Sequence, residues 1–201
     1  MKPNNLFILG VTGGVGTGKS TVLSMLAEEG FFVIRADDVA KDLEKPGQKA
    51  FEALRASFGN AILSKDGEID RKRFAEVIFG DPEALKKVNN IVHPLVKNEI
   101  LVMIKEEAQK GRRCFAVEAA LFLEAGYADF SHKILFVRAD EEVRRARLKA
   151  SRHYSDEKIT AIMGAQKEEA FYASAADFVI DNSGLECETR KAVKEITDRV
   201  F

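Results

Sequence analysis

The residues best suited to chemistry form one glycine-rich stretch near the start of the chain. Residues 13–20 read Gly-Gly-Val-Gly-Thr-Gly-Lys-Ser and match G-x-x-x-x-G-K-[ST] at every fixed position. Glycine lets a backbone approach phosphate closely, so that its N–H groups can surround the anion. Lys19 supplies a positive charge for the outer phosphates, and the hydroxyl of Ser20 is a suitable Mg²⁺ ligand. The stretch predicts a site for a nucleoside triphosphate with Mg²⁺.

The segments on either side of this stretch decide between a phosphate-binding loop and a glycine-rich turn without a ligand. Residues 6–9 are apolar and predict a buried strand. Residues 21–27 predict a helix, because Val22, Met25 and Leu26 recur at helical spacing. Strand, loop and helix are the context that the motif requires, so the phosphate-binding loop is favoured.

Two acidic residues follow later apolar stretches. Asp37 has the residue type to orient an acceptor hydroxyl and take its proton, but it equally suits the cap of a helix beginning at Val39. Glu118 ends an apolar run, where an acid can hold Mg²⁺ or its water ligands. A surface acid is the alternative for Glu118, and Glu124 is a possible substitute.

Basic residues gather in two places. Arg71 begins a basic triplet that suits either an anion clamp or a solvated face. Residues 141–152 hold four arginines, of which Arg144 and Arg147 share one helical face, while Glu141 is expected to pair with Arg145. Such a run is usually a solvated face, but next to a phosphate-binding loop it favours a mobile lid that closes over the transferring phosphoryl group.

These residues need a sheet to bring them together. Short apolar runs predict five strands, at residues 6–9, 31–34, 114–118, 133–137 and 178–180. Helices between strands indicate an α/β fold with a parallel sheet flanked by helices, and such sheets bind ligands at the carboxyl ends of their strands. The turn at residues 181–184, which includes Asn182, lies at that edge, and its backbone is expected to contact a nucleotide base.

The middle of the chain predicts helices without strands. A helix is expected to start at Asp81-Pro82, the pair His93-Pro94 to end it, and another to span residues 95–108. Residues 155–172 predict a single further helix. We therefore divide one domain into a core (residues 1–39, 110–139 and 173–201), a helical substrate lobe (about 40–109) and a lid (about 140–172).

Composition narrows the function classes. The chain has 201 residues and a net charge of −1, which argues against a general nucleic-acid-binding protein. It has two cysteines, both expected to be buried thiols of a reducing compartment, and no apolar run long enough for a membrane span. The segment before the first strand leaves no room for a signal peptide, so a cytoplasmic location is expected.

Six stretches, in this order, resemble segments of the dephospho-coenzyme A kinase family. They are residues 10–21, 33–37 (VIRAD), 66–71 (DGEIDR), 92–95 (VHPL), 117–124 (VEAALFLE) and 176–184 (ADFVIDNSG). The resemblance implies a P-loop kinase fold, and an enzyme that uses ATP and Mg²⁺ to phosphorylate the 3′-hydroxyl of dephospho-coenzyme A, the last step of coenzyme A synthesis. Substrates are then ATP and dephospho-coenzyme A, without nucleic acid or membrane partners, and the chain is a monomer or small homo-oligomer.

Matching positions also imply roles for individual residues. The resemblance makes Asp37 the base, with Lys19 and Arg147 as the other catalytic residues, and places Arg71 and His93 with Asp37 in the substrate site. Ser20 and Glu118 are the expected metal ligands. From the residues alone, His93 is a structural histidine by default. The expected ATP-binding residues are Gly13, Gly14, Val15, Gly16, Thr17, Gly18, Lys19, Ser20, Thr21, Arg147 and Asn182.

The sequence departs from the family pattern at a few positions. Arg35 stands where the first Asp of V-I-D-A-D is expected, and Ala120 where Pro is usual. The second lid arginine is shifted, because Ser151 occupies its position and Arg152 follows it. Two other functions remain as alternatives: a P-loop kinase for another small acceptor such as a nucleoside monophosphate, and a nucleotide-dependent switch that controls a partner.

Overall fold

The computed structural model describes residues 6–200, which form two compact units. The first comprises the residues up to Ile34 and those from Lys110 onward, and the second comprises Arg35–Gln109. The prediction about a signal peptide concerns residues 1–5 and lies outside the described part. Within that part, no helix combines the length and the apolar character needed to cross a bilayer.

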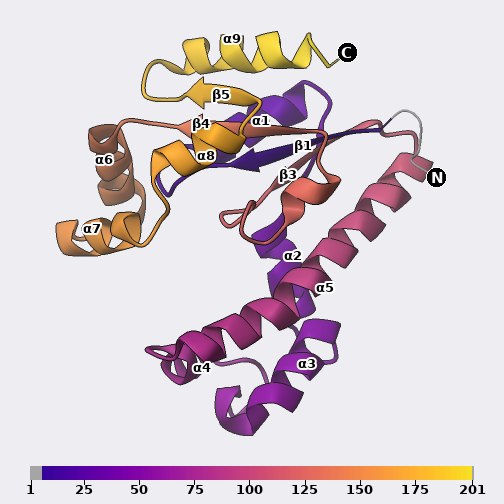
Figure 1. Ribbon diagram of the computed structural model, residues 1–201, viewed down its shortest axis with the longest axis vertical. Coiled ribbons are helices and arrows are strands. Elements are labelled where there is room, and N and C mark those ends of the chain that lie inside the picture. The colour runs from indigo at the N-terminus through magenta and orange to yellow at the C-terminus, as the bar shows by residue number, and fades with distance from the viewer. Residues whose placement is uncertain (1–5, 201) are drawn as a thin grey trace. The chain divides into compact units, whose positions relative to one another are not determined.

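A five-stranded parallel sheet organises the first unit (Figure 1). Its strands, in the spatial order β2-β3-β1-β4-β5, confirm the five predicted runs. The central strand β1 runs three residues beyond its predicted end, because Gly10, Val11 and Thr12 still pair with β4. The strand bounds are β1 Phe7–Thr12, β2 Phe32–Arg35, β3 Cys114–Glu118, β4 Lys133–Arg138 and β5 Phe178–Asp181.

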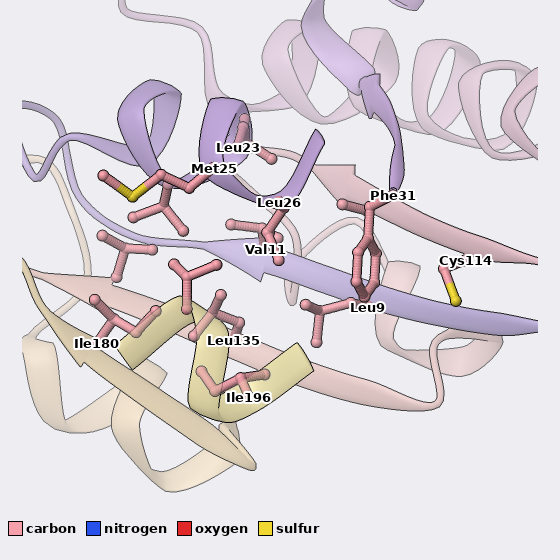
Figure 2. Close-up of a cluster of buried hydrophobic side chains, with 14 residues drawn as sticks. Leu9, Val11, Leu23, Met25, Leu26, Phe31, Cys114, Leu135, Ile180 and Ile196 are labelled. Atoms are coloured by element: carbon pink, nitrogen blue, oxygen red, sulfur yellow. The ribbon is translucent and has the colours of Figure 1, made fainter. Parts of the chain in front are cut away.

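Apolar side chains fix the sheet between helices. Leu9 and Val11 alternate along β1 and are fully buried against α1 (Lys19–Glu28) and α9 (Glu186–Thr197), as Figure 2 shows. On β4, Phe136 stacks on Tyr172 of α8 (Glu169–Ala175), with ring centroids 5.6 Å apart. Because β1 and β4 are clamped in this way, the loop between β1 and α1 starts from a rigid base.

The second unit consists mainly of helices. Its long helix α5 (Pro82–Gln109) buries one side chain per turn, and the helix contacts α2, α3 and α4. Those buried residues are Val92, Val96, Ile100 and Ile104. The other elements are α2 (Ala36–Leu43), α3 (Lys49–Phe58), the 3₁₀ turn η1 (Gly59–Ile62) and α4 (Arg71–Ile78).

Three expectations about helices are wrong. The helix after β2 starts at Ala36 rather than Val39, so Asp37 and Asp38 lie in its first turn and do not cap it. The helix α5 continues through Pro94, because its buried face compensates for the one hydrogen bond that proline removes. The predicted helix over residues 155–172 is two helices.

The lid region contains three helices rather than two. Figure 1 shows α6 (Glu141–Arg152) and α7 (Asp156–Gly164) following β4, and α8 packs on the sheet. The chain leaves helical geometry between Gly164 and Glu169, where the side chain of Gln166 turns toward the glycine-rich loop. Ser155 caps α7 by accepting a hydrogen bond from the N–H of Lys158.

Candidate active site

The glycine-rich loop has a formed, internally bonded conformation. The hydroxyl of Thr17 donates to the carbonyl of Gly14 at 2.9 Å. The ammonium group of Lys19 donates to the carbonyls of Gly13 and Gly14 at 2.8 and 3.1 Å. Gly18 adopts φ +84° at the N-cap of α1 and offers no side chain to the first N–H groups of that helix. These N–H groups and the helix dipole are therefore available to an anion.

Glu118 lies beside the lysine of the loop. Its carboxylate is 3.8 Å from the Lys19 ammonium, and both side chains are mostly buried, with 12% and 15% exposed. The pairing register explains the proximity, because Glu118 ends β3 opposite Val11 of β1, two residues before the loop. The strand-end acid and the loop lysine are thus brought together.

Asn182 is a buried anchor for the loop rather than a surface residue. Its amide donates to the carbonyl of Thr17 at 2.8 Å, and its side-chain oxygen accepts from the hydroxyl of Thr189 at 2.8 Å. Arg147 joins the same group, since its guanidinium donates to the carbonyl of Asn182 at 2.8 Å and to that of Thr17 at 3.4 Å. Two residues expected to bind ATP therefore hold the loop where it enters α1.

A second pair of residues holds the opposite half of the loop. Arg144 of α6 donates from Nε to the carbonyl of Val15 at 2.8 Å and from Nη2 to Gln166 at 3.0 Å. The same Gln166 oxygen accepts from the N–H of Val15 at 3.1 Å. Sequence reasoning placed Arg144 on the face of Arg147 without a role of its own. Sequence reasoning missed Gln166, because it expected one continuous helix over residues 155–172. The structure interrupts that helix between Gly164 and Glu169, and this break lets the Gln166 side chain reach the loop.

The residues expected to bind the acceptor lie in the second unit. Asp37 is exposed in the first turn of α2. Arg71 starts α4 and pairs with Glu44 at 3.1 Å, and burial of Glu44 raises the pKa of its carboxyl although Arg71 opposes that shift. His93 is half-buried in α5. In the structure, Arg71 therefore forms an ion pair with a carboxylate of its own unit.

Comparisons with known proteins identify the family. The model of the dephospho-CoA kinase family matches residues 7–187. The chain belongs to the dephospho-CoA kinase family. The dephospho-CoA kinase of Geobacillus kaustophilus is 35% identical over 188 residues, with 94% of each chain covered. That of Carboxydothermus hydrogenoformans is 37% identical over 192 residues, covering 96% of this chain and 93% of the relative.

Solved structures agree with this family and its fold. The dephospho-CoA kinase from Campylobacter jejuni superposes with a TM-score of 0.70 at 26% identity, with 96% of each chain covered. A protein from Thermus thermophilus gives a TM-score of 0.82 at 29% identity, covering 98% of this chain and 99% of that one. Shikimate kinase from Acinetobacter baumannii, at 14% identity and a TM-score of 0.54, shares the fold. The chain is therefore a phosphotransferase with a P-loop kinase fold, and ATP is the donor in its family.

The donor chemistry of the site suits a hard divalent cation such as Mg²⁺. Ser20 is the second residue of α1, directly after Lys19, and Glu118 contributes a carboxylate near the loop. Residues 6–200 contain no group of three His, Cys, Asp or Glu side chains arranged to hold a metal. Mg²⁺ in kinase sites is typically held by one or two protein oxygens, substrate phosphates and water, so a Ser–Glu pair fits it.

Proposed function

We propose that this chain transfers the γ-phosphoryl group of ATP to the 3′-hydroxyl of the ribose of dephospho-coenzyme A, releasing coenzyme A and ADP. The observation that carries the proposal is the match to the dephospho-CoA kinase family over residues 7–187, in a chain whose phosphate-binding loop is complete. A kinase for a different small acceptor is not favoured by these relatives. The two soluble substrates and the absence of a membrane span in residues 6–200 support a cytoplasmic enzyme.

In this proposal the donor binds to the loop of residues 13–21. Its backbone N–H groups, together with the start of α1, surround the inner phosphates. The ammonium group of Lys19 contacts the outer phosphates, and in the free protein the carbonyls of Gly13 and Gly14 hold it at the loop. Ser20 and Glu118 would hold Mg²⁺, which offsets phosphate charge when bound.

The acceptor hydroxyl is assigned to Asp37. A carboxylate that accepts a hydrogen bond from this hydroxyl orients it toward the γ-phosphorus and takes its proton as the new P–O bond forms. Arg71 is proposed to exchange its pairing with Glu44 for a phosphate of the acceptor, and His93 to contact the acceptor from α5. Arg147 is proposed to neutralise charge on the transferring group, and Asn182 to support the nucleotide end of the site.

A kinase assay tests the proposal directly. The full chain is incubated with Mg-ATP and dephospho-coenzyme A, and the product is identified by mass. Adenosine, AMP and a sample without acceptor serve as controls. We expect one phosphate to be gained on dephospho-coenzyme A and none on the controls. ATP turnover with another acceptor, or with none, would contradict the assignment of the acceptor while leaving the loop as the donor site.

A further inference from the structure

Arg144 is the arginine that approaches the first half of the phosphate-binding loop. Its guanidinium lies directly against Gly14, since a Cβ built on that glycine would be only 2.6 Å from Nη2. Any side chain at residue 14 would displace it. Hydrogen bonds to the carbonyl of Val15 and to Gln166 fix its orientation. Two hydrogen bonds and the close approach to Gly14 therefore fix the position of the guanidinium at the loop.

The charge of Arg144 is not used in an ion pair. Its hydrogen-bond partners are two neutral oxygens, and among the described residues no carboxylate lies within 4.0 Å of it. Neighbouring cations differ: Arg145 pairs with Glu141 at 2.8 Å, and Lys149 pairs with Asp156 at 2.8 Å. Arg144 is also half-buried, and burial lowers the pKa of its guanidinium. A desolvated cation held by carbonyls is well suited to bind an anion.

The contact with Gly14 indicates which phosphate this cation would meet. The ammonium group of Lys19 donates to the carbonyl of the same residue at 3.1 Å, and in this motif the lysine contacts the outer phosphates. Arg147 instead contacts Thr17, near the start of α1. Arg144 thus shares its glycine with the cation of the outer phosphates.

We propose that Arg144 is a catalytic residue that leaves Gln166 and contacts the γ-phosphate of bound ATP, supplying the second lid arginine that this chain lacks at Ser151. Ser151 is uncharged, and its hydroxyl donates to the carbonyl of Arg147 within α6, so Ser151 cannot supply a positive charge to the phosphates. Nη2, now donating to Gln166, would donate to a γ-phosphate oxygen instead. The inference rests on the proposed function only in requiring ATP as the donor.

A purely structural role makes a different prediction. If Arg144 only shapes the loop through the carbonyl of Val15, its loss should weaken ATP and ADP alike, because the loop holds phosphates present in both. If Arg144 contacts the γ-phosphate, its loss should weaken ATP selectively. The ratio of the two dissociation constants therefore separates the two roles without requiring any acceptor.

The test uses Arg144→Gln in the full chain, with Arg145→Gln as matched control and Arg152→Gln as the competing lid arginine. Titration calorimetry gives Kd for Mg-ATP and Mg-ADP, and steady-state kinetics with dephospho-coenzyme A gives kcat. Arg144→Met, which keeps the aliphatic packing, replaces the glutamine variant if the melting temperature falls. We expect the Kd of ATP to rise at least about tenfold more than that of ADP, and kcat to fall roughly 100-fold.

Equal changes in the two dissociation constants, or none, would overturn the proposal, as would a selective loss of ATP in Arg152→Gln alone. The control Arg145→Gln should retain kcat within about threefold, because its partners are side chains of α6 and α7 (Glu141, Asp156 and Thr160) and none belongs to the loop. Failure of the proposed function would look different: the unaltered chain would not phosphorylate dephospho-coenzyme A, while the nucleotide titrations would still report on Arg144.

Discussion

Single side chains connect distant segments at the loop, and Asn182 is the clearest case. It is 5% exposed and bonds to Thr17 and Thr189. Replacement by alanine leaves the buried hydroxyl of Thr189 and a loop carbonyl without these partners. We expect Asn182→Ala to lower the free energy of unfolding by about 2–3 kcal/mol and to weaken ATP binding. Urea denaturation measures the first effect, and Ser174→Ala, on an exposed hydroxyl, should change it by less than about 0.5 kcal/mol.

Asp37 can be tested against its immediate neighbour. We expect Asp37→Asn to lower kcat by about 10²–10⁴-fold while ATP affinity is retained, because a general base is lost and no donor contact is changed. Asp38→Asn is the matched control, since Asp38 lies on the same turn and pairs with Lys41 at 2.8 Å. Near-normal turnover in Asp37→Asn, or equal losses in both variants, would remove Asp37 from the role of base.

Residue types and spacing predicted the loop and the acid that the structure places beside it, while their roles in binding stay predictions. The motif of residues 13–20 identified the loop, and the end of an apolar run identified Glu118. The structure adds contacts between distant residues, which spacing along the chain cannot predict. Arg144 and Gln166 are 22 positions apart and meet at Val15, some 130 residues earlier in the chain, so no local pattern connects them.

At the scale of elements, α5 tests how a helix tolerates proline. Pro94 is exposed, while the neighbouring turns are held by Val92 and Val96 on the buried face. We expect Pro94→Ala to raise the free energy of unfolding of the lobe by about 1–3 kcal/mol, because it restores one backbone hydrogen bond and removes a steric conflict. Denaturant unfolding, or hydrogen exchange in α5, measures the gain.

Asn98→Ala is the control for this prediction, because it changes helix propensity at another exposed position of α5 without restoring a hydrogen bond. Its gain should stay below about 0.7 kcal/mol. A loss of stability in Pro94→Ala would mean that the proline ring itself contributes packing that the helix needs.

The elements of the sheet were predictable and the helix ends were less so. All five strands follow from apolar runs, and the signal is least broken in the inner strands β1, β3 and β4, which are buried along most of their length. Helix ends depend on competing local contacts. Asp37 has the residue type of a cap, yet β2 passes directly into α2 through Arg35 and leaves no separate cap position for it. The break at Gln166 follows from a tertiary contact, the bond to Val15.

At the scale of the whole molecule, the two units should respond differently to acid. In the first unit, burial of Asp177 raises the pKa of its carboxyl. Hydrogen bonds from Lys133 and from the N–H of Ile134 outweigh this effect, so that the pKa is lowered overall. Such a group stabilises the fold above its unfolded pKa, and this contribution is lost as pH falls below about 4. Glu44, in the second unit, has a raised pKa, so its contribution is present at low pH and is lost as pH rises.

Asp177→Asn tests this linkage. We expect the variant to be less stable than the unaltered chain above pH 5, and the difference to shrink as pH falls below about 4, where the aspartate is itself protonated. Urea denaturation at a series of pH values measures the difference. A difference that stays constant across that range would contradict the role of the lowered pKa.

Glu44→Gln is the corresponding change in the lobe and should act with the opposite sign. Relative to the unaltered chain, the glutamine variant should gain stability as pH rises above the ordinary pKa of a glutamate, about 4.3, because there the carboxyl ionises readily in the unfolded chain but resists ionisation in the folded one. Unit-resolved hydrogen exchange distinguishes the two responses.

The three-way division into core, lobe and lid stays a prediction.

The two cysteines differ in a way that gives the protein one natural attachment point for a probe. Cys114 is buried in β3, and burial raises the pKa of its thiol, so it should react slowly. Cys187 is exposed in the first turn of α9, so the prediction that both thiols are buried is wrong for this residue. A thiol-reactive fluorophore should therefore label Cys187 alone, two residues before Thr189, the hydrogen-bond partner of Asn182. Nucleotide titrations could then be followed optically in the unaltered chain.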